Sequence, residues 1–254
     1  MVSIILPSWK DPLLTKTIAD LLLKAEGEIE IIAVLDGYWP DFELINDPRV
    51  KYVHLGKNRG MRGAINAGVL VSKGEFICRM DEHQMVGQGF DKILAKTCRD
   101  NWIVTPRRFF LDPVKWEVMD LPPVDYMKLK ISGGKFTGVA RSGDDKRKLQ
   151  ESQAMQGSFW FMKRKWWDDV IGELQTEGYG PLIQDSHEMV FKTWKAGGAL
   201  VVNKNTWHAH KHRSFARTHN SGTTENPANC EQGYAYAIKV WGDYYNQLVK
   251  EGKL

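Results

Sequence analysis

Three polar residues end an apolar segment at positions 76–83, which reads FICRMDEH. Asp81, Glu82 and His83 follow directly on a run with the composition of a buried strand. Residues two apart in an extended chain point to the same side, so Asp81 and His83 share a face. A carboxylate oxygen and an imidazole nitrogen suit Mn²⁺ or a similar divalent ion better than Ca²⁺. The pattern predicts a site for Mn²⁺ or Mg²⁺ at this strand end.

Two protein ligands do not fill a coordination sphere, so others must come from a distant segment and from a bound substrate. Diphosphate oxygens are well suited to be the metal ligands that the substrate supplies. The segment WHAHKH at 207–212 follows a predicted strand, and its histidines are the expected distant donors. We expect His208 and His212 to contact solvent or an acceptor molecule rather than the metal.

The segments around Asp81 alternate between strand and helix patterns. Apolar runs predict buried strands at residues 2–6, 29–35, 50–55 and 76–80. Helical spacing of apolar residues at 11–24, and small residues at 61–71, predict two helices, the second packed closely on a sheet. This order predicts an α/β fold with an open, mostly parallel twisted sheet flanked by helices.

Ligands of such sheets bind at the carboxyl ends of the strands. Asp36 and Asp81 both follow strands and are expected to face one crevice; the alternative for Asp36 is a turn residue before Gly37. Pro7 and Ser8 end the first strand at the same edge and are expected at the same ligand. Arg62 lies near a helix N-terminus, where it could meet phosphate or lie on the surface.

The second half of the chain is less regular. Residues 112–150 are rich in glycine and charge and indicate an irregular insertion, and residues 211–229 indicate a mobile loop. The remaining predicted elements are helices at 164–172, 185–196 and 230–250 and a strand at 199–203. No repeat or low-complexity linker divides the chain, so we expect one domain over residues 1–254.

Composition limits the class of protein. The 254 residues are 43% hydrophobic and 26% charged, without a run long enough to span a bilayer. The start, MVSIILPSWK, has no basic leader, and the three cysteines are odd in number, so we expect a cytoplasmic protein with reduced thiols. The net charge is +4, and basic residues alternate with aromatic ones in TPRRFF and KRKWW. Such clusters fit nucleic acid, or a solvated surface.

The order of motifs resembles the GT-A nucleotide-sugar glycosyltransferases, in particular the catalytic domain of the polypeptide N-acetylgalactosaminyltransferases. The similar segments, in chain order, are GAINAGVLVSKGEFICRMDEH, MQGSFWFMKRKWWDDVIG, DSHEMVFKTWKAGGALVV, HAHKHR and AIKVWGDYY. Together they extend over residues 2–245. Asp-x-His alone is weakly specific, whereas the ordered set is specific.

The resemblance implies a UDP-sugar donor, with residues 1–105 binding the nucleotide and 106–254 the sugar and acceptor. It implies that Asp81, His83 and His210 bind Mn²⁺ and that Asp36 contacts the nucleoside. Arg213 would reach the diphosphate, and Asp185 would lie near the reacting sugar. The family retains anomeric configuration.

The sequence also departs from that family. LIQDSHE stands where the family has Trp-Gly-Gly-Glu-Asn, so the donor-sugar pocket is expected to differ. We see neither the lectin domain nor the membrane anchor of the family, which favours a cytosolic acceptor. A 5-hydroxymethylpyrimidine, such as hydroxymethylcytosine in phage-type DNA, is the leading candidate. A protein Ser or Thr and a polysaccharide or lipid precursor are alternatives.

Two alternatives belong to other classes. One is a nucleotide-binding module without turnover, against which the combination of Asp81, His83 and His210 argues. The other is a nucleotidyltransferase, which would need a glycine-rich phosphate loop where this chain has LPSWKDP.

Overall fold

A computed structural model describes residues 1–141, 146–211 and 230–254. The first half contains β1 (Val2–Ser8), α1 (Leu14–Lys24), β2 (Ile29–Asp36), β3 (Val50–Leu55), α2 (Gly60–Val71), β4 (Phe76–Met80), β5 (Gln84–Val86) and α3 (Phe90–Thr97). The second half contains β6 (Trp102–Asp112), β7 (Glu117–Val118), β8 (Tyr126–Ser132), β9 (Lys135–Arg141), β10 (Leu149–Glu151), β11 (Phe159–Lys163), α4 (Arg164–Trp166), a π-helix (Trp167–Ile171), α5 (Asp185–Lys195), β12 (Ala199–His210) and α6 (Cys230–Lys250).

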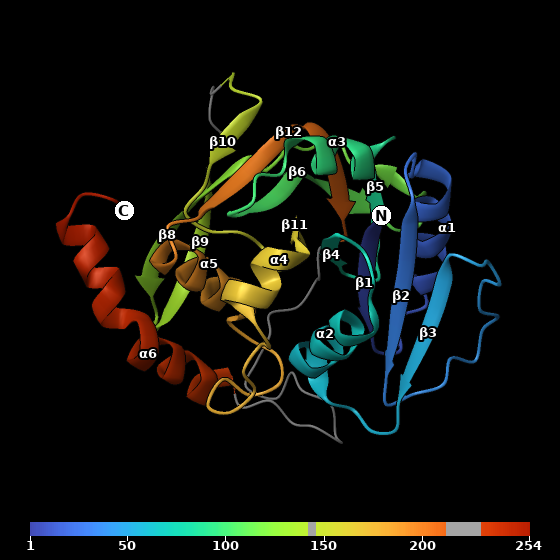
Figure 1. Cartoon of the computed structure of the whole chain (residues 1–254), viewed down its shortest axis with the longest axis horizontal. Helices are drawn as coiled ribbons and strands as arrows, with labels where there is room; N and C mark the ends of the chain where they lie inside the picture. Colours follow the sequence, from blue (N-terminus) through green and yellow to red (C-terminus); the bar gives the residue numbers. More distant parts are fainter. Residues whose placement is uncertain (142–145, 212–229) are drawn as a thin grey trace.

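The strands form a central ten-stranded sheet and a separate hairpin, β8–β9 (Figure 1). The central path is β10-β12-β6-β11-β4-β1-β2-β3, so strands from both halves of the chain share one sheet. β1, β2, β3 and β4 are parallel, and β12 is parallel to β6. β11 runs antiparallel between β4 and β6. The mostly parallel sheet expected from the sequence is confirmed.

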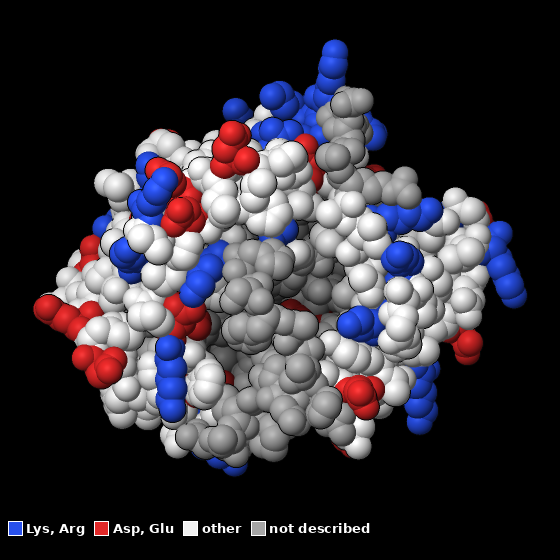
Figure 2. All heavy atoms as spheres, turned by 180° about the vertical axis from the view of Figure 1, so that it is seen from behind, with Lys and Arg blue, Asp and Glu red and all other residues white. Residues whose placement is uncertain are grey.

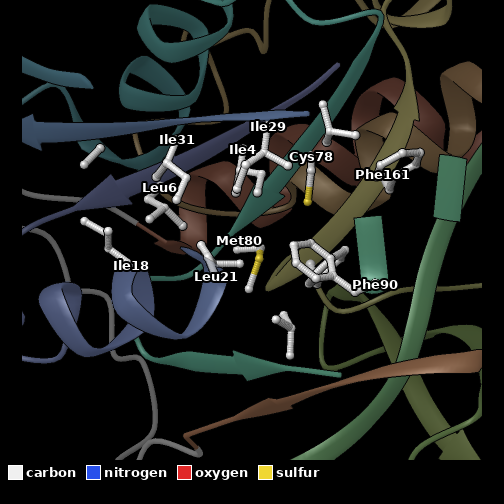
Figure 3. Close-up of a cluster of buried hydrophobic side chains, with 14 of the residues drawn as sticks. Ile4, Leu6, Ile18, Leu21, Ile29, Ile31, Cys78, Met80, Phe90 and Phe161 are labelled. Atoms are coloured by element: carbon white, nitrogen blue, oxygen red, sulfur yellow. The ribbon is translucent and has the colours of Figure 1, made fainter. Parts of the chain in front are cut away.

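Alternate side chains of the buried strands point to two cores. Ile4 and Leu6 of β1 pack with α1 and with Phe90 of α3 (Figure 3). Ile5 lies in the other core, with α2 and α5. A Cβ at Gly68 of α2 would come within 2.4 Å of Ile5 Cγ2, so the small residues of this helix let it approach the sheet closely, as predicted.

Several elements differ from the sequence-based expectation. β1 continues through Pro7 to Ser8 instead of ending before it. The pairing of β1 with β4 ends at Ile5, so beyond that point no backbone N–H of β1 has to donate to β4. Pro7, which has no N–H, is therefore tolerated in the strand. The region 112–150, expected to be irregular, contains a regular hairpin, β8–β9, over residues 126–141. β6 was not predicted, and β12 extends beyond residue 203 to His210.

The helix expected at 164–172 is a short α-turn followed by a π-helix. The helices expected at 11–24, 61–71, 185–196 and 230–250 agree with the structure to within a few residues, and α3 was not predicted. Among the described residues, no helix is long and apolar enough to cross a membrane.

Candidate metal centre and adjoining cavity

Strand pairing brings Asp81, His83 and His210 together from distant parts of the chain. Asp81 follows β4 directly, and its backbone N–H donates to Ser158 O at 3.0 Å. His83 immediately precedes β5, which pairs antiparallel with the end of β12. In that register His210 is opposite Gln84, the residue after His83. The sheet therefore fixes all three backbone positions.

The three side chains present one ligand atom each to a common point. His210 Nε2 lies 3.0 Å from Asp81 Oδ2 and 3.1 Å from His83 Nε2. His83 Nε2 lies 3.9 Å from Asp81 Oδ2. A single point about 2.0 Å from all three atoms satisfies these separations, close to the bond lengths of divalent metals with N and O ligands. The donor set fits a Mn²⁺-type ion with the remaining positions left to a bound ligand.

Electrostatics hold Asp81 and His210 in the protonation states that bind metal. Burial would raise the pKa of Asp81, but the Arg79 guanidinium and His210 hold it well below its usual range. Arg79 Nη2 donates to Asp81 Oδ1 at 2.5 Å. Burial lowers the pKa of His210 to about 4, although Asp81 opposes the shift. At neutral pH the carboxylate is ionised and the imidazole is neutral, as metal ligation requires.

A second carboxylate orients His83. Asp11 Oδ2 lies 3.0 Å from His83 Nδ1, on the side of the ring away from the metal point. A proton on Nδ1, donated to Asp11, leaves the lone pair of Nε2 free for a metal. Glu82 lies on the Asp11 side, where burial together with Asp11 and Asp81 raises its pKa well above its usual range.

A cavity of about 360 Å³ adjoins the three ligands, and Asp81, Arg79 and His210 form part of its wall. The other walls come from β9, from the segment before β11 and from the start of α5. Residues of these walls include Phe136, Thr137, Gln156, Gly157, Ser158, Gln184, Asp185 and His187.

Many polar atoms in this wall lack a hydrogen-bond partner among the described residues. They are Thr137 Oγ1, Ser158 Oγ, Gln184 Oε1, Asp185 Oδ2 and both ring nitrogens of His187. Buried polar groups are nearly always satisfied in folded proteins. A group of unsatisfied hydroxyl, amide, carboxylate and imidazole atoms around one cavity therefore indicates a ligand with several hydroxyl or amide groups.

Comparison with known proteins identifies the class of this site. The family model described as Glycosyl transferase family 2 matches residues 3–171, more than half of the chain. The chain belongs to glycosyl transferase family 2. The metal ligands Asp81 and His83 fall inside the matched region, and His210 falls beyond it.

The transferase also resembles a solved structure, the crystal structure of GalNAc-T7 with UDP, GalNAc and Mn²⁺. The TM-score is 0.75 at 15% sequence identity, over 97% of this chain and 50% of that one. The transferase thus spans about half the length of GalNAc-T7, and the likeness shows a shared fold, the GT-A fold. No curated protein matches the chain.

Asp185 of the transferase lies in the cavity wall, in the first turn of α5, and is 5% exposed. A Cβ at Gly157 would lie 2.9 Å from Asp185 Oδ2, so the glycine leaves room for this carboxylate. His187, two residues further on, also faces the cavity, and burial lowers its pKa to about 4.

Asp36, Pro7 and Ser8 lie at the strand ends expected from the sequence. The Asp36 carboxylate accepts from Arg59 N at 2.7 Å and Asn58 Nδ2 at 3.0 Å, which fixes the loop before α2. The Ser8 hydroxyl lies 2.5 Å from the Tyr38 hydroxyl, and Pro7 is buried. Contacts from these three residues to a nucleotide stay a prediction.

The structure does not place Arg62 where a phosphate could meet it. Its side chain is fully buried and pairs with Glu188 at 2.5 Å, and it also donates to Ile183 O and Gln175 O. Arg62 therefore has a structural role instead of the expected nucleotide contact. Its guanidinium connects α2 to α5 and to the segment between the π-helix and α5. Sequence spacing alone could not distinguish a phosphate contact from an internal ion pair.

Arg213, His212 and the loop expected at 211–229, except for Lys211, lie outside the described residues. His208 is described and is not at the surface: it is 3% exposed. The expectation that it meets solvent or acceptor is wrong, because β12 continues past residue 203 and buries this position beside β6.

Sequence analysis missed two residues of the site. Arg79 is a charged residue inside an apolar strand, and it lies on the same face as Asp81, two residues later. This pattern could have identified Arg79 as a residue of the site. Asp11 is the first residue of the segment predicted as a helix, and its contact with His83, 72 residues away, has no local signal.

Proposed function

We propose that the transferase moves a sugar, GalNAc or a related hexose, from a UDP-sugar to a hydroxyl acceptor with the help of Mn²⁺ or Mg²⁺. The observation that carries the proposal is the triangle of Asp81, His83 and His210 at the edge of a cavity with unsatisfied polar atoms. The triangle of ligands suits an ion bound to a diphosphate, and the cavity beside it suits a sugar. The GT-A neighbour was crystallised with UDP, GalNAc and Mn²⁺, which supports this assignment.

Each residue of the site has a part in this proposal. Asp81, His83 and His210 would hold the ion, and Asp36, Pro7 and Ser8 at the neighbouring strand ends would contact the nucleoside. The bound ion would stabilise negative charge on the departing diphosphate. Arg213 would contact the same diphosphate.

Asp185 would orient the sugar rather than attack it. Its carboxylate lies in the cavity wall with one oxygen unpartnered among the described residues. In the front-face route that we propose, the acceptor hydroxyl passes its proton to the leaving phosphate, and configuration is retained. NMR of the product from an α-linked donor tests this route: an α-product is expected, and a β-product would refute it.

The acceptor that we propose is the hydroxyl of a 5-hydroxymethylpyrimidine in phage-type DNA, exposed by flipping the base. The net charge of +4 supports binding to a polyanion. The basic–aromatic clusters contribute less free charge than their sequences suggest. Arg107 pairs with Asp125 at 2.6 Å and Lys165 with Asp169 at 2.5 Å. On the face seen in Figure 2, Lys and Arg form one group at the upper edge and are otherwise spread over the left and right sides.

The three cysteines are buried thiols, which suits a reducing compartment, and a cytoplasmic location, in the host cell if the gene is phage-borne, is part of the proposal.

A donor screen tests the activity directly. The protein is incubated with Mn²⁺, a panel of UDP-sugars and either hydroxymethylated or unmodified DNA, and products are measured by mass spectrometry. We expect a hexose or N-acetylhexosamine mass on the hydroxymethylated DNA only. Binding to DNA should weaken steeply between about 50 and 200 mM salt if phosphate contacts dominate. No DNA binding at low salt, with transfer to a protein or polysaccharide hydroxyl instead, would reject DNA as the acceptor.

A further inference from the structure

A second, smaller cavity lies between the edge of the sheet and the β8–β9 hairpin. Its volume is about 30 Å³, room for a particle of one or two water volumes. Arg108 of β6, His208 of β12 and Ser158 before β11 are among its lining residues. Ser158 also lines the 360 Å³ cavity, so the two cavities share part of a wall.

Arg108 is a buried cation without a carboxylate partner among the described residues. It is 6% exposed, and its Nε and Nη2 atoms have no hydrogen-bond partner. Its guanidinium stacks on Phe110, with 4.8 Å between Cζ and the ring centroid. Burial lowers its pKa to about 10, which still leaves it charged at neutral pH.

Asp125 is the acidic residue that lines this cavity, but its charge is already shared by two other cations. Arg107 Nε and Nη2 donate to its two oxygens at 2.6 and 2.7 Å, and Lys204 Nζ lies 3.9 Å from Oδ2. An unpaired buried ion typically costs several kcal/mol, so some compensation for Arg108 is required.

The other polar groups of the cavity can also donate hydrogen bonds. The hydroxyl of Ser158 is buried and has no partner among the described residues, and the two buried ring nitrogens of His208 make no well-aligned hydrogen bond there, although the ring lies close to the backbone of Pro106. An imidazole offers one N–H in either neutral tautomer, a hydroxyl offers one O–H, and a guanidinium only donates. The cavity therefore presents several donors and one uncompensated positive charge to a space of small volume.

We propose that this cavity is a binding site for a small monovalent anion such as chloride, held by Arg108, His208 and Ser158. The anion offsets the charge of Arg108 beside the neighbouring strands β6 and β12. β12 pairs with β6 and ends in the metal ligand His210, so Arg108 repels positive charge at the metal ligands. The anion also reduces this repulsion. The site is separate from the donor cavity, and its occupation does not depend on the proposed reaction.

Thermal unfolding of the metal-free protein tests the site. The Tm is measured in sodium chloride, sodium formate and sodium gluconate at equal ionic strength, where gluconate is too large for the cavity. We expect chloride and formate to raise the Tm by about 3–5 °C for each tenfold increase above their dissociation constants. Equal Tm values in chloride and gluconate would overturn the proposal.

Variants separate this site from general salt effects. Arg108→Met should remove the difference between chloride and gluconate, whereas Arg99→Met, at an exposed position ahead of β6, should keep it. Should Arg108→Met not fold, Ser158→Ala takes its place and should weaken the chloride response at least several-fold. A full chloride response in a folded Arg108 or Ser158 variant would overturn the proposal.

Crystals grown in bromide provide the direct view. An anomalous peak in the small cavity, within hydrogen-bond distance of Arg108 and Ser158, is expected. Density for water only, without an anomalous signal, would overturn the assignment. Neither measurement uses substrate, so failure here would leave the proposed transferase activity unaffected.

Discussion

Replacing Arg62 with methionine should destabilise the protein strongly without a direct effect on nucleotide binding. The side chain is 0% exposed, and Glu188, its partner, is 1% exposed. Among the residues that the structure describes, the replacement leaves Glu188 paired with Lys192, at 2.8 Å, and it removes two donors from Ile183 O. Breaking a buried ion pair costs about 3–5 kcal/mol, which in a chain of this size lowers the Tm by about 6–20 °C.

The assay is chemical and thermal unfolding, with Arg59→Met as the matched control. Arg59 lies three residues earlier, immediately before α2, and is exposed, so its replacement should change stability by less than about 0.5 kcal/mol. The double variant Arg62→Met, Glu188→Gln should recover part of the loss, because no unpaired carboxylate stays buried. An unchanged Tm for Arg62→Met, together with weaker UDP binding, would show that Arg62 reaches the nucleotide after all.

Three further predictions concern the site. Asp11→Asn should lower Mn²⁺ affinity about 10–100-fold in titration calorimetry and shift the His83 tautomer seen by ¹⁵N NMR, with little change in the Tm; unchanged affinity would mean that Asp11 does not orient His83. Asp185→Asn should reduce kcat at unchanged Mn²⁺ affinity, and equal kcat would exclude a part in catalysis. Lowering the pH should destabilise the metal-free protein between about 6.5 and 4, because the folded pKa values of His187 and His210 are about 4 and the unfolded chain binds more protons in that window. Each histidine contributes up to about 3 kcal/mol of this loss, and His187→Gln should flatten the slope; a flat profile in the wild-type protein would contradict the burial of these rings.

The first half of the fold could be predicted because its signals are local. Strands such as Ile29–Asp36 are largely apolar, with one internal charge at Glu30, and α2 is marked by small residues that fit a close helix–sheet contact. The position of Asp81 and His83 follows from the end of such a run. These features depend on short stretches of sequence and on the general geometry of parallel sheets.

The second half depends on contacts that no local pattern specifies. The β8–β9 hairpin packs Leu129 and Phe136 against Phe191 of α5 and Trp241 of α6, and these contacts, rather than alternation alone, make its glycine-rich segment regular. The extension of β12 to His210 likewise depends on pairing with β5 and β6. The pairing that places His210 beside Asp81 could be expected from the resemblance, but not its distances.

The central claim is that Asp81, His83 and His210 form one divalent-metal site. The most direct test is a crystal structure of the protein with Mn²⁺ and UDP, with data collected at the manganese absorption edge. We expect one anomalous peak about 2.0–2.3 Å from Asp81 Oδ2 and from Nε2 of both histidines, in contact with diphosphate oxygens. A bound UDP without manganese at these three atoms, or manganese held elsewhere, would contradict it.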